Sequence, residues 1–322
     1  MKVLIDKYVP YLEHILNPFA EVEHIAPEDF TPARVRDADA LIVRTRTNIN
    51  KELLSGSRVR FIATATIGYD HIDTSYCQAN DIVWTNCPGC NSQAVCDYIE
   101  EALHEINHCS YRNLIGTSWE SHRNLNLTLG IIGVGHVGSK VAAMAERLGC
   151  RVLLNDPPKH IGVSLDEIAA QADIITFHTP LDASTYHLCN AEFLAKCQPH
   201  ALIINAARGG IVDEQALLDS QHPYVIDCWE NESHINPAVL LNDRCLLASY
   251  HIAGYSVGGK RNASQMCLDA ICNFFGLPAL KIQKNFVPLH GDSEKGWLTR
   301  VSQQLKAQPN HFEQLRKQYK LR

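Results

Sequence analysis

Residues 129–138 read LGIIGVGHVG, an apolar run followed by the glycine pattern GxGxxG. The run predicts a buried strand, and residues 136–148 predict a helix because their apolar side chains recur on one face. Between a strand and a helix, three glycines in this pattern permit a tight turn, close approach of the backbone to a pyrophosphate, and close packing of the helix on the sheet. These glycines are Gly133, Gly135 and Gly138. The stretch therefore predicts a dinucleotide site at the start of a helix.

An acidic residue stands where such a site needs one. The next predicted strand, residues 151–155, is followed by Asp156, which lies 18 positions after Gly138. A carboxylate there accepts hydrogen bonds from the ribose hydroxyls of adenosine and repels a 2′-phosphate, so the sequence favours NAD over NADP. His136 and Val137 open the helix, where unpaired backbone N–H groups attract phosphate. The alternative interpretation of Asp156 is a turn residue before two prolines.

Strands and helices alternate along the chain, which predicts an α/β fold with doubly wound parallel sheets. In the first 90 residues the predicted strands are 3–6, 21–25, 40–44, 60–64 and 82–85, with helices near 10–16, 50–55 and 72–79. The second series of predicted strands is 129–134, 151–155, 173–177, 201–205, 224–228 and 245–249. A capping-box pattern from Ser164 to Glu167 opens a helix within that series. Longer helices over residues 92–108 and 258–275 are expected to connect two lobes, with a ligand in the cleft between them.

The composition excludes several classes of protein. The chain has 322 residues, enough for about two domains. Its 29 basic and 35 acidic residues give a net charge of −6, which offers no footprint for nucleic acid. No apolar run is long enough to span a bilayer, and Asp6 interrupts the opening apolar run, so that run does not fit a secretory signal. We therefore expect a cytoplasmic protein that binds neither nucleic acid nor membrane.

Twelve cysteines leave three interpretations open. Cys87 and Cys90 have the CxxC spacing of a redox pair or of half a zinc site, but no second half completes a zinc ligand set. The other cysteines stand mostly among apolar neighbours, which is typical of buried structural thiols. Reduced structural cysteines are favoured, and no metal is expected. A redox pair would instead form a disulfide under mild oxidant.

Three side chains suited to hydride-transfer chemistry follow successive strands of the second series: Arg208, Glu232 and His251. Ligands of open α/β sheets gather at the carboxyl ends of strands. Oxidation of a hydroxy acid needs a cation for the substrate carboxylate, a base for the hydroxyl proton, and a carboxylate beside that base. Taken singly, the three residues also fit a surface ion pair, a loop acid and a loop histidine.

In this order, after a nucleotide fingerprint, the three residues resemble the Arg–Glu–His set of the D-isomer-specific 2-hydroxyacid dehydrogenases. The resemblance implies that Arg208 binds the carboxylate and carbonyl oxygen of the substrate, that His251 is the acid/base, and that Glu232 stabilises its imidazolium. Glu230 is the competing carboxylate. In the family pattern Asp-x-x-x-x-Glu, counted from Asp227, the paired acid is Glu232.

The resemblance covers most of the chain and extends to the ligands. Beyond the glycines, His136, Val137 and Asp156, it implies cofactor contacts from Thr179, Ala206, Ala207, Arg208, Asp227 and Gly254. It implies a phosphorylated 2-hydroxy acid as substrate, contacted by Thr45, Thr66 and Tyr255. A phosphate also needs cationic donors, for which Arg44 and Arg46 are the first candidates. Alternation along an extended segment would point both arginines the same way, whereas a solvated strand end is the other interpretation.

The resemblance also implies a domain plan and an assembly. Residues 1–92 and about 258–280 form a flavodoxin-like substrate-binding domain, residues 93–257 a Rossmann NAD-binding domain, and residues 281–322 a shortened C-terminal dimerisation region. A homodimer is expected, although the basic residues 315–322 also fit a solvated helix. Two alternatives stay open: another phosphorylated 2-hydroxyacid dehydrogenase, such as phosphoglycerate dehydrogenase, and a non-catalytic NAD(H)-sensing protein of the corepressor kind.

Overall fold

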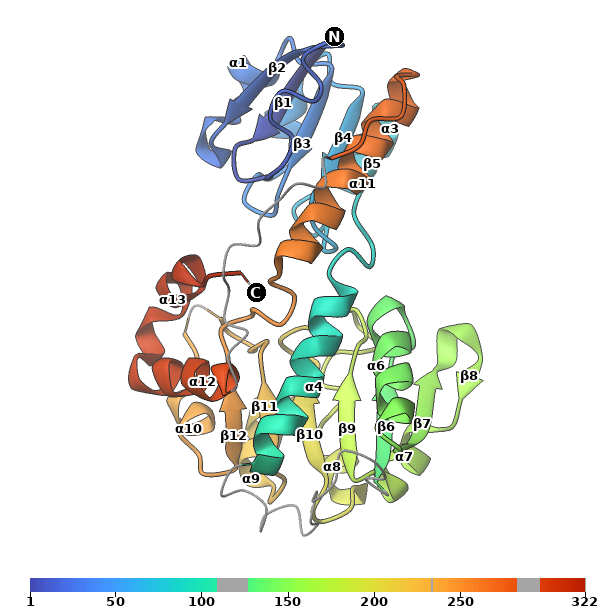
Figure 1. Ribbon diagram of the computed structural model, residues 1–322, viewed down its shortest axis with the longest axis vertical. Helices are drawn as coiled ribbons and strands as arrows, with labels where there is room; N and C mark the ends of the chain where they lie inside the picture. The colour runs from blue at the N-terminus through green and yellow to red at the C-terminus, as the bar shows by residue number, and fades with distance from the viewer. Residues whose placement is uncertain (109–126, 233, 283–295, 322) are drawn as a thin grey trace. The chain divides into compact units, whose positions relative to one another are not determined.

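The computed structural model of the protein describes residues 1–108, 127–232, 234–282 and 296–321. The chain divides into two compact units. Unit 1 comprises Met1–Asn91 and Ser256–Pro288, and unit 2 comprises Ser92–Tyr255 and Leu289–Arg322. Each unit is built on its own β-sheet (Figure 1). The predicted α/β fold class is therefore confirmed.

The sheet of unit 1 is wholly parallel, with strand order β2-β1-β3-β4-β5. Its strands are β1 (Lys2–Asp6), β2 (Glu21–Ile25), β3 (Ala40–Val43), β4 (Phe61–Thr64) and β5 (Val83–Thr85). Every residue of β3 and β4 is buried, as expected of central parallel strands that are covered on both faces. The order of strands reverses between β1 and β3, which makes the carboxyl ends of these two strands the ligand-binding edge of the unit.

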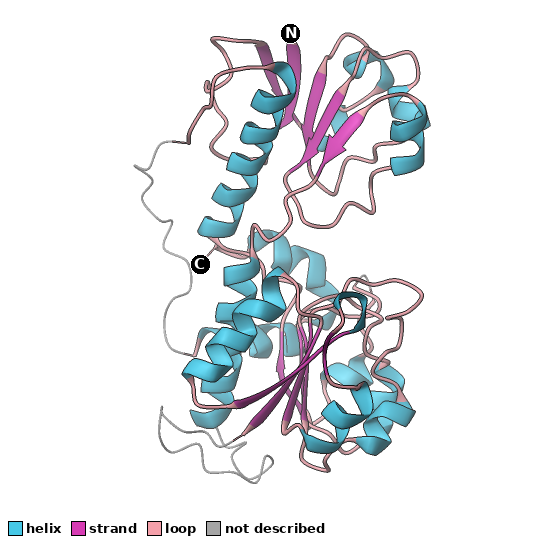
Figure 2. Cartoon of the chain, turned by 90° about the vertical axis from the view of Figure 1, so that its right-hand side faces the viewer, coloured by secondary structure: helices cyan, strands magenta, loops and turns pink. Residues whose placement is uncertain are grey.

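Helices cover the two faces of this sheet (Figure 2). They are α1 (Pro32–Val35), α2 (Lys51–Leu54), α3 (Thr74–Ala79) and the long α11 (Val257–Phe275), with a 3-10 turn at Pro27–Asp29. The predicted helices near residues 50–55 and 72–79 are confirmed by α2 and α3. Helix α11 buries Ala263, Cys267 and Ile271 against the sheet, at a spacing of four residues that places them on one helical face.

The helix predicted near residues 10–16 is wrong. The chain forms turns there, and Tyr11 and His14 have φ values of 68° and 63°. Left-handed backbone at two positions cannot continue a right-handed helix. Leu12 and Leu16 are fully buried, so their i, i+4 spacing, which a helical face would also give, reflects two separate contacts of the turn with the core.

The sheet of unit 2 has the order β12-β11-β10-β9-β6-β7-β8. Its strands are β6 (Thr128–Ile132), β7 (Arg151–Asp156), β8 (Ile161–Gly162), β9 (Ile174–Phe177), β10 (Leu202–Asn205), β11 (Tyr224–Ile226) and β12 (Cys245–Ala248). The six predicted strands are all present and parallel, whereas the short antiparallel β8 was not predicted. This is the doubly wound order, with its switch point between β6 and β9.

Four helices in the described part of unit 2 begin at a side-chain cap. The helices are α4 (Ser92–His108), α6 (His136–Arg147), α7 (Leu165–Gln171), α8 (Ala191–Lys196), α9 (Glu214–Asp219), α10 (Pro237–Leu240), α12 (Trp297–Ala307) and α13 (Phe312–Gln318), with 3-10 turns at Pro157–Lys159 and Pro309–His311. The four capped helices are α7 to α10. The predicted cap at Ser164 is confirmed, because its Oγ accepts the Glu167 N–H at 3.1 Å. None of the helices in the described residues has the length and apolarity to cross a membrane.

The two C-terminal helices pack on unit 2. Trp297, Leu298, Phe312 and Leu315 belong to its hydrophobic core, and the Glu105 carboxylate accepts the Leu298 N–H at 2.8 Å at the start of α12. Helix α13 thus buries Phe312 and Leu315, whereas its basic residue Lys317 is exposed, as in the solvated helix that residues 315–322 also fit. A dimerisation role for this region stays a prediction.

Candidate active site

The glycine motif forms the turn from β6 into α6. A Cβ atom on Gly138 would lie 2.0 Å from the carbonyl oxygen of Gly133, so the close approach of helix and turn requires glycine there. Gly135 is the N-cap of α6, and a Cβ atom on it would meet nothing within 4 Å. The backbone N–H groups of the first helical residues, His136 and Val137, have no acceptor within the helix, and such groups at a helix N-terminus suit a pyrophosphate.

Asp156 lies at the end of β7, beside this turn. Its Oδ2 atom accepts the Val134 N–H at 2.9 Å and pairs with the Lys159 ammonium at 3.1 Å. Lys159 also donates to the Val134 carbonyl at 2.7 Å. Sequence analysis missed this lysine, whose charge offsets part of the repulsion that Asp156 exerts on a 2′-phosphate. Its position three residues after Asp156, inside a turn, was the available signal.

His178 and Thr179 follow β9 at the switch point. Burial lowers the pKa of His178 to about 3, so its ring stays neutral. Within the described part of the chain, the buried Nδ1 of His178 and Oγ1 of Thr179 have no hydrogen-bond partner. Buried polar atoms are rarely left unsatisfied in native proteins, so a bound molecule is the expected partner here. The turn and these atoms together fit NAD.

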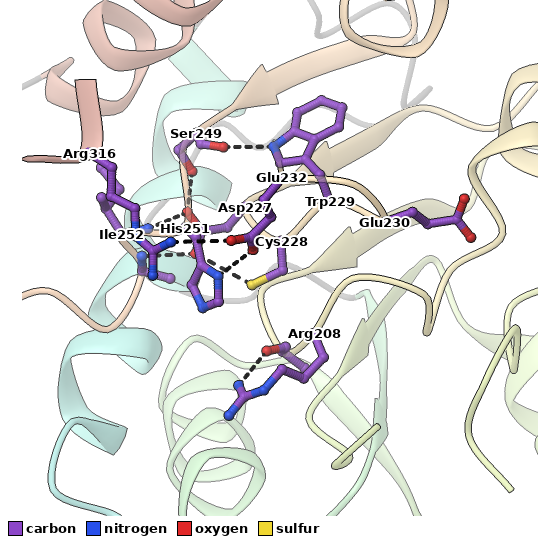
Figure 3. Close-up of polar contacts among 12 residues, drawn as sticks. Arg208, Asp227, Cys228, Trp229, Glu230, Glu232, Ser249, His251, Ile252 and Arg316 are labelled. Atoms are coloured by element: carbon purple, nitrogen blue, oxygen red, sulfur yellow. Dashed lines mark hydrogen bonds and ion pairs between the residues drawn. The ribbon is translucent and has the colours of Figure 1, made fainter. Parts of the chain in front are cut away.

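The loop after β10 carries Arg208. The Asn205 side chain donates to the carbonyl oxygens of Arg208 at 2.9 Å and Cys228 at 3.2 Å, which fixes the loop to the neighbouring strand end. A Cβ atom on Gly209 would lie 1.8 Å from the Trp229 carbonyl oxygen, so only glycine fits this approach. The Arg208 guanidinium donates to its neighbour's carbonyl, that of Ala207, at 2.7 Å (Figure 3). Ala206, beside it, is buried.

Asp227 anchors the loop that carries His251. Its Oδ1 atom accepts the Ser249 hydroxyl at 2.6 Å and the Ile252 N–H at 2.8 Å, and its Oδ2 atom accepts the Ala253 N–H at 2.9 Å. The residue is 1% exposed. Its backbone carbonyl accepts the N–H of His251, which has a left-handed φ of 57°. Such backbone is uncommon for residues other than glycine and is often found at functional sites. The predicted contact of Asp227 with NAD stays a prediction.

The structure brings Glu232 and His251 together. The Nδ1 atom of His251 hydrogen-bonds Oε1 of Glu232, and the other carboxylate oxygen, Oε2, accepts Nη1 of Arg316 at 3.2 Å (Figure 3). Burial favours the protonated form of Glu232, but the hydrogen bond from His251 and the charges of His251, Arg316 and Arg208 outweigh it, so the pKa of Glu232 lies below its usual value. Glu232 is therefore ionised at neutral pH. Arg316 was not predicted, because its contact lies 84 positions away in sequence.

The competing carboxylate, Glu230, points away from His251 (Figure 3). It hydrogen-bonds Nε2 of His187, whose Nδ1 lies 3.6 Å from Asp213. The ligand atoms of His187, Asp213 and Glu230 lie within 4.8 Å of one another, but the two carboxylates face different nitrogens of the ring. Glu232, and not Glu230, is the glutamate that hydrogen-bonds His251, and its catalytic role stays a prediction.

The predicted substrate residues of unit 1 lie at the carboxyl edge of its sheet. Residues 44–47 form a turn, with the Thr47 N–H donating to the Arg44 carbonyl at 3.1 Å, so the extended segment expected there is wrong and alternation does not orient Arg44 and Arg46. Arg44 donates to the Tyr8 carbonyl at 3.4 Å, and Thr45 and Arg46 are exposed. Thr66 shares a hydrogen bond of 2.7 Å with Thr64, which in turn contacts His71.

The thiols do not form the CxxC pair. Cys87 lies with its Sγ 3.6 Å from that of Cys267, and burial raises the pKa of Cys90 to about 12. All cysteines in the described ranges are free and buried. Reduced structural cysteines were the favoured prediction, and the geometry of these residues agrees with it.

Comparison with known proteins places this geometry in a family. Residues 103–253 match the family described as "D-isomer specific 2-hydroxyacid dehydrogenase, NAD binding domain". Two curated relatives, the erythronate-4-phosphate dehydrogenases of Bacteroides thetaiotaomicron and Bacteroides fragilis, are 44% and 42% identical, over 100% of this chain and 97% of each relative. An NAD+-bound 3-phosphoglycerate dehydrogenase from Entamoeba histolytica superposes with a TM-score of 0.68 and 26% identity, covering 89% of this chain and 99% of that one.

The chain belongs to the D-isomer-specific 2-hydroxyacid dehydrogenases. It is an NAD-dependent enzyme of that class, and the curated relatives it matches over nearly their whole length are erythronate-4-phosphate dehydrogenases.

Proposed function

We propose that the protein oxidises 4-phospho-D-erythronate to 3-hydroxy-2-oxo-4-phosphooxybutanoate with NAD, a step of pyridoxine 5′-phosphate (vitamin B6) biosynthesis. The substrate is supported by the names of the relatives at 44% and 42% identity. The chemistry is supported by one observation above all: a histidine–carboxylate pair, His251 and Glu232, lies within the field of Arg208 on the unit that carries the nucleotide turn.

The tautomer of His251 follows from its partner. An ionised carboxylate only accepts hydrogen bonds, so Nδ1 of His251 carries a proton toward Glu232 and Nε2 is left as the acceptor. Nε2 takes the proton of the substrate's C2 hydroxyl as the C2–H bond breaks. The imidazolium that results is stabilised by the negative charge of Glu232. NAD, held at the turn of Gly133, Gly135 and Gly138 and beside Thr179, supplies the acceptor for the hydride that leaves C2.

Arginines are assigned to the two anionic ends of the substrate. Arg208 binds the carboxylate and polarises the developing carbonyl oxygen, for which a guanidinium offers paired donors. Arg44 and Arg46 contact the phosphate from the switch point of unit 1, where Asp6 is buried between β2 and β3. Burial raises the pKa of Asp6 although the charges of Arg44 and Arg46 oppose that shift. Thr45, Thr66 and Tyr255 complete the predicted substrate contacts.

A panel of 2-hydroxy acids tests this proposal. The purified protein is incubated with NAD and 4-phospho-D-erythronate, 3-phospho-D-glycerate, D-erythronate or D-lactate, and NADH is followed at about 340 nm. We expect the highest kcat/KM with 4-phospho-D-erythronate and a large loss without the phosphate. Highest turnover of 3-phosphoglycerate would favour the phosphoglycerate dehydrogenase alternative. Binding of NADH without turnover of any acid would favour the NAD(H)-sensing alternative.

We also propose that the enzyme is a cytoplasmic homodimer. The free buried thiols of the described residues suit a reducing compartment. The dimer is supported by the resemblance of residues 312–319 to the dimerisation region of related enzymes. Sedimentation equilibrium at micromolar concentration tests it, with a mass near twice 36.0 kDa expected.

A further inference from the structure

The C-terminal helix α13 delivers one side chain to the acid/base pair. Arg316 donates from Nη1 to Oε2 of Glu232 at 3.2 Å and from Nε to the Tyr255 hydroxyl at 3.1 Å. Its guanidinium carbon also lies 5.8 Å from the centre of the Tyr255 ring, within cation–π range. The Arg316 side chain is only 24% exposed, so these contacts are held in a largely water-excluded place.

The position of Arg316 is set by the packing of its helix. Phe312 and Leu315 are 2% and 3% exposed, and the Phe312 ring meets the edge of Tyr250, which lies next to His251 in sequence. Because Arg316 follows Leu315 directly and lies one turn after Phe312, anchoring these two residues in the core directs the arginine along the same side of the helix. A long, flexible side chain thus gains a fixed geometry from its helix.

We propose that Arg316 is a positioning residue of the active site: it fixes the Glu232 carboxylate against His251 and the Tyr255 hydroxyl in its place. The inference rests on the proposed function, in which His251 moves the proton and Tyr255 contacts the substrate. Glu232 uses one oxygen for His251 and the other for Arg316, so the arginine restricts the rotation of the carboxylate as well as adding charge. The C-terminal segment is then part of the catalytic apparatus.

An arginine suits this task better than a lysine. Two acceptors, a carboxylate oxygen and a phenolic oxygen, are served at once by Nη1 and Nε of one planar group. A lysine ammonium at the same place keeps the charge but lacks the fixed fork that spans both acceptors. Glu313, on the same helix, accepts from Nη1 of Arg316 at 3.3 Å and is the remaining carboxylate around the guanidinium.

The charge environment gives the direction of the pH effect. The charged and titratable groups around Glu232 are His251, Arg316, Arg208 and the buried thiol of Cys228. Arg316 in turn contacts the Tyr255 hydroxyl and the Glu313 carboxylate. Arg316 and Arg208 lower the pKa of Glu232, which keeps it ionised beside His251. Removing the Arg316 charge raises the pKa of Glu232. Activity, which needs the ionised carboxylate, should therefore be lost at a higher pH as the solution is acidified.

Three variants test the proposal on the full-length protein. Arg316→Gln is expected to lower kcat/KM about 10-fold to 100-fold, part of the 10²–10⁴-fold that a positioned acid/base contributes. Its kcat/KM–pH profile should have an acidic limb about one pH unit higher than that of the wild type. Arg316→Lys keeps the charge, so the acidic limb should return toward the pH of the wild type. KM for the acid should be higher than in the wild type in both Arg316 variants, because neither holds the Tyr255 hydroxyl as arginine does. Lys317→Gln, which removes an exposed cation from the same helix, is the matched control and should change neither.

A second readout separates this proposal from the proposed function. If no acid of the panel is turned over, the proposed function fails, and the pH titration of the Glu232 carboxyl carbon by NMR in the NAD complex still tests Arg316. That titration should move to higher pH in Arg316→Gln and not in Lys317→Gln, because Arg316 lowers the pKa of Glu232. An acidic limb and a carboxyl titration that both stay in place in a folded Arg316→Gln overturn the proposal. If Arg316→Gln does not fold, additive effects of Arg316→Lys and Tyr255→Phe on KM overturn it, and non-additive effects support it.

Discussion

Two histidine–glutamate pairs lie among the described residues of unit 2, and their surroundings differ. Both histidines have left-handed backbone, with φ of 57° at His251 and 50° at His187, and both bond a glutamate of the same loop. Glu232, the partner of His251, is also bound by Arg316. His187 instead has carboxylates at both ring nitrogens, Glu230 and Asp213, and its ring stacks on Tyr186 at 4.0 Å.

A histidine–carboxylate pair can act as an acid/base only when one ring nitrogen stays available. In the first pair, Arg316 binds the carboxylate and Nε2 of His251 is left to accept a proton. In the second pair, both nitrogens of His187 face negative oxygens, so the ring serves as a clamp between two loops. One of these loops carries Gly210, whose carbonyl oxygen accepts the backbone N–H of His187 at 2.7 Å.

Substitution of the two histidines should give the largest difference between the pairs. His251→Asn should lower kcat about 10²–10⁴-fold, because no other group takes the hydroxyl proton. His187→Asn should lower kcat less than about threefold, because the clamp contacts no reacting atom. Initial rates of NADH formation with saturating substrate measure both. Equal losses in the two variants would contradict the assignment of roles.

The two glutamates give the next largest difference. Glu232→Gln keeps the shape of the side chain but removes the charge that stabilises the imidazolium, so kcat should fall about 10-fold to 100-fold. Glu230→Gln, two residues away on the same loop, should leave kcat within about threefold of the wild type. The kcat values of the two variants are compared at pH 8, and their melting temperatures show whether both are folded. A larger loss in Glu230→Gln would reverse the assignment.

Asp156 is a further carboxylate of unit 2, and its cationic partner is a lysine, Lys159. Asp156→Ala removes the repulsion of a 2′-phosphate and leaves Lys159 available to pair with it, so the ratio of kcat/KM for NAD over NADP should fall about tenfold. Lys159→Gln is the matched variant and should raise that ratio. A wild-type enzyme that already prefers NADP would show that this carboxylate does not set the preference.

The smallest expected effect concerns the stability of the fold and comes from Glu214, which contacts the second pair. Glu214 accepts the Glu230 N–H at 2.7 Å, and burial raises the pKa of Glu214 to about 7. The folded state thus holds this proton more tightly than the unfolded chain, where a glutamate has a pKa of about 4.3. The resulting stability is present below about pH 4 and is lost as pH rises to about 7.

Glu214→Gln should therefore flatten the dependence of unfolding free energy on pH over this window. At pH 8 the free energy of unfolding of the variant should exceed that of the wild type by on the order of 1 kcal/mol. Urea unfolding at pH 5 and pH 8 measures it, and the wild-type slope in the variant would show that Glu214 is not the titrating group.

Much of the fold is determined locally and could be predicted. Buried parallel strands appear in the sequence as short apolar runs, and the glycine motif predicted the turn from β6 to α6. The failure at residues 10–16 has the same physical origin: an i, i+4 apolar spacing records burial and does not distinguish a helix from a turn that inserts two leucines. The two-residue β8 was too short to leave a pattern.

The candidate site was predictable as a set of residues and not as a network. The order Arg208, Glu232, His251 is present in the sequence, because each follows a strand and strand ends meet at one edge of a parallel sheet. The family pattern counted from Asp227 predicted Glu232 as the partner of His251. That Arg316 arrives from 84 positions away on the other oxygen of Glu232 is decided by how helix α13 packs on the core. Periodicity reports contacts within a few residues of chain, whereas side chains that meet across such separations are brought together only by tertiary packing.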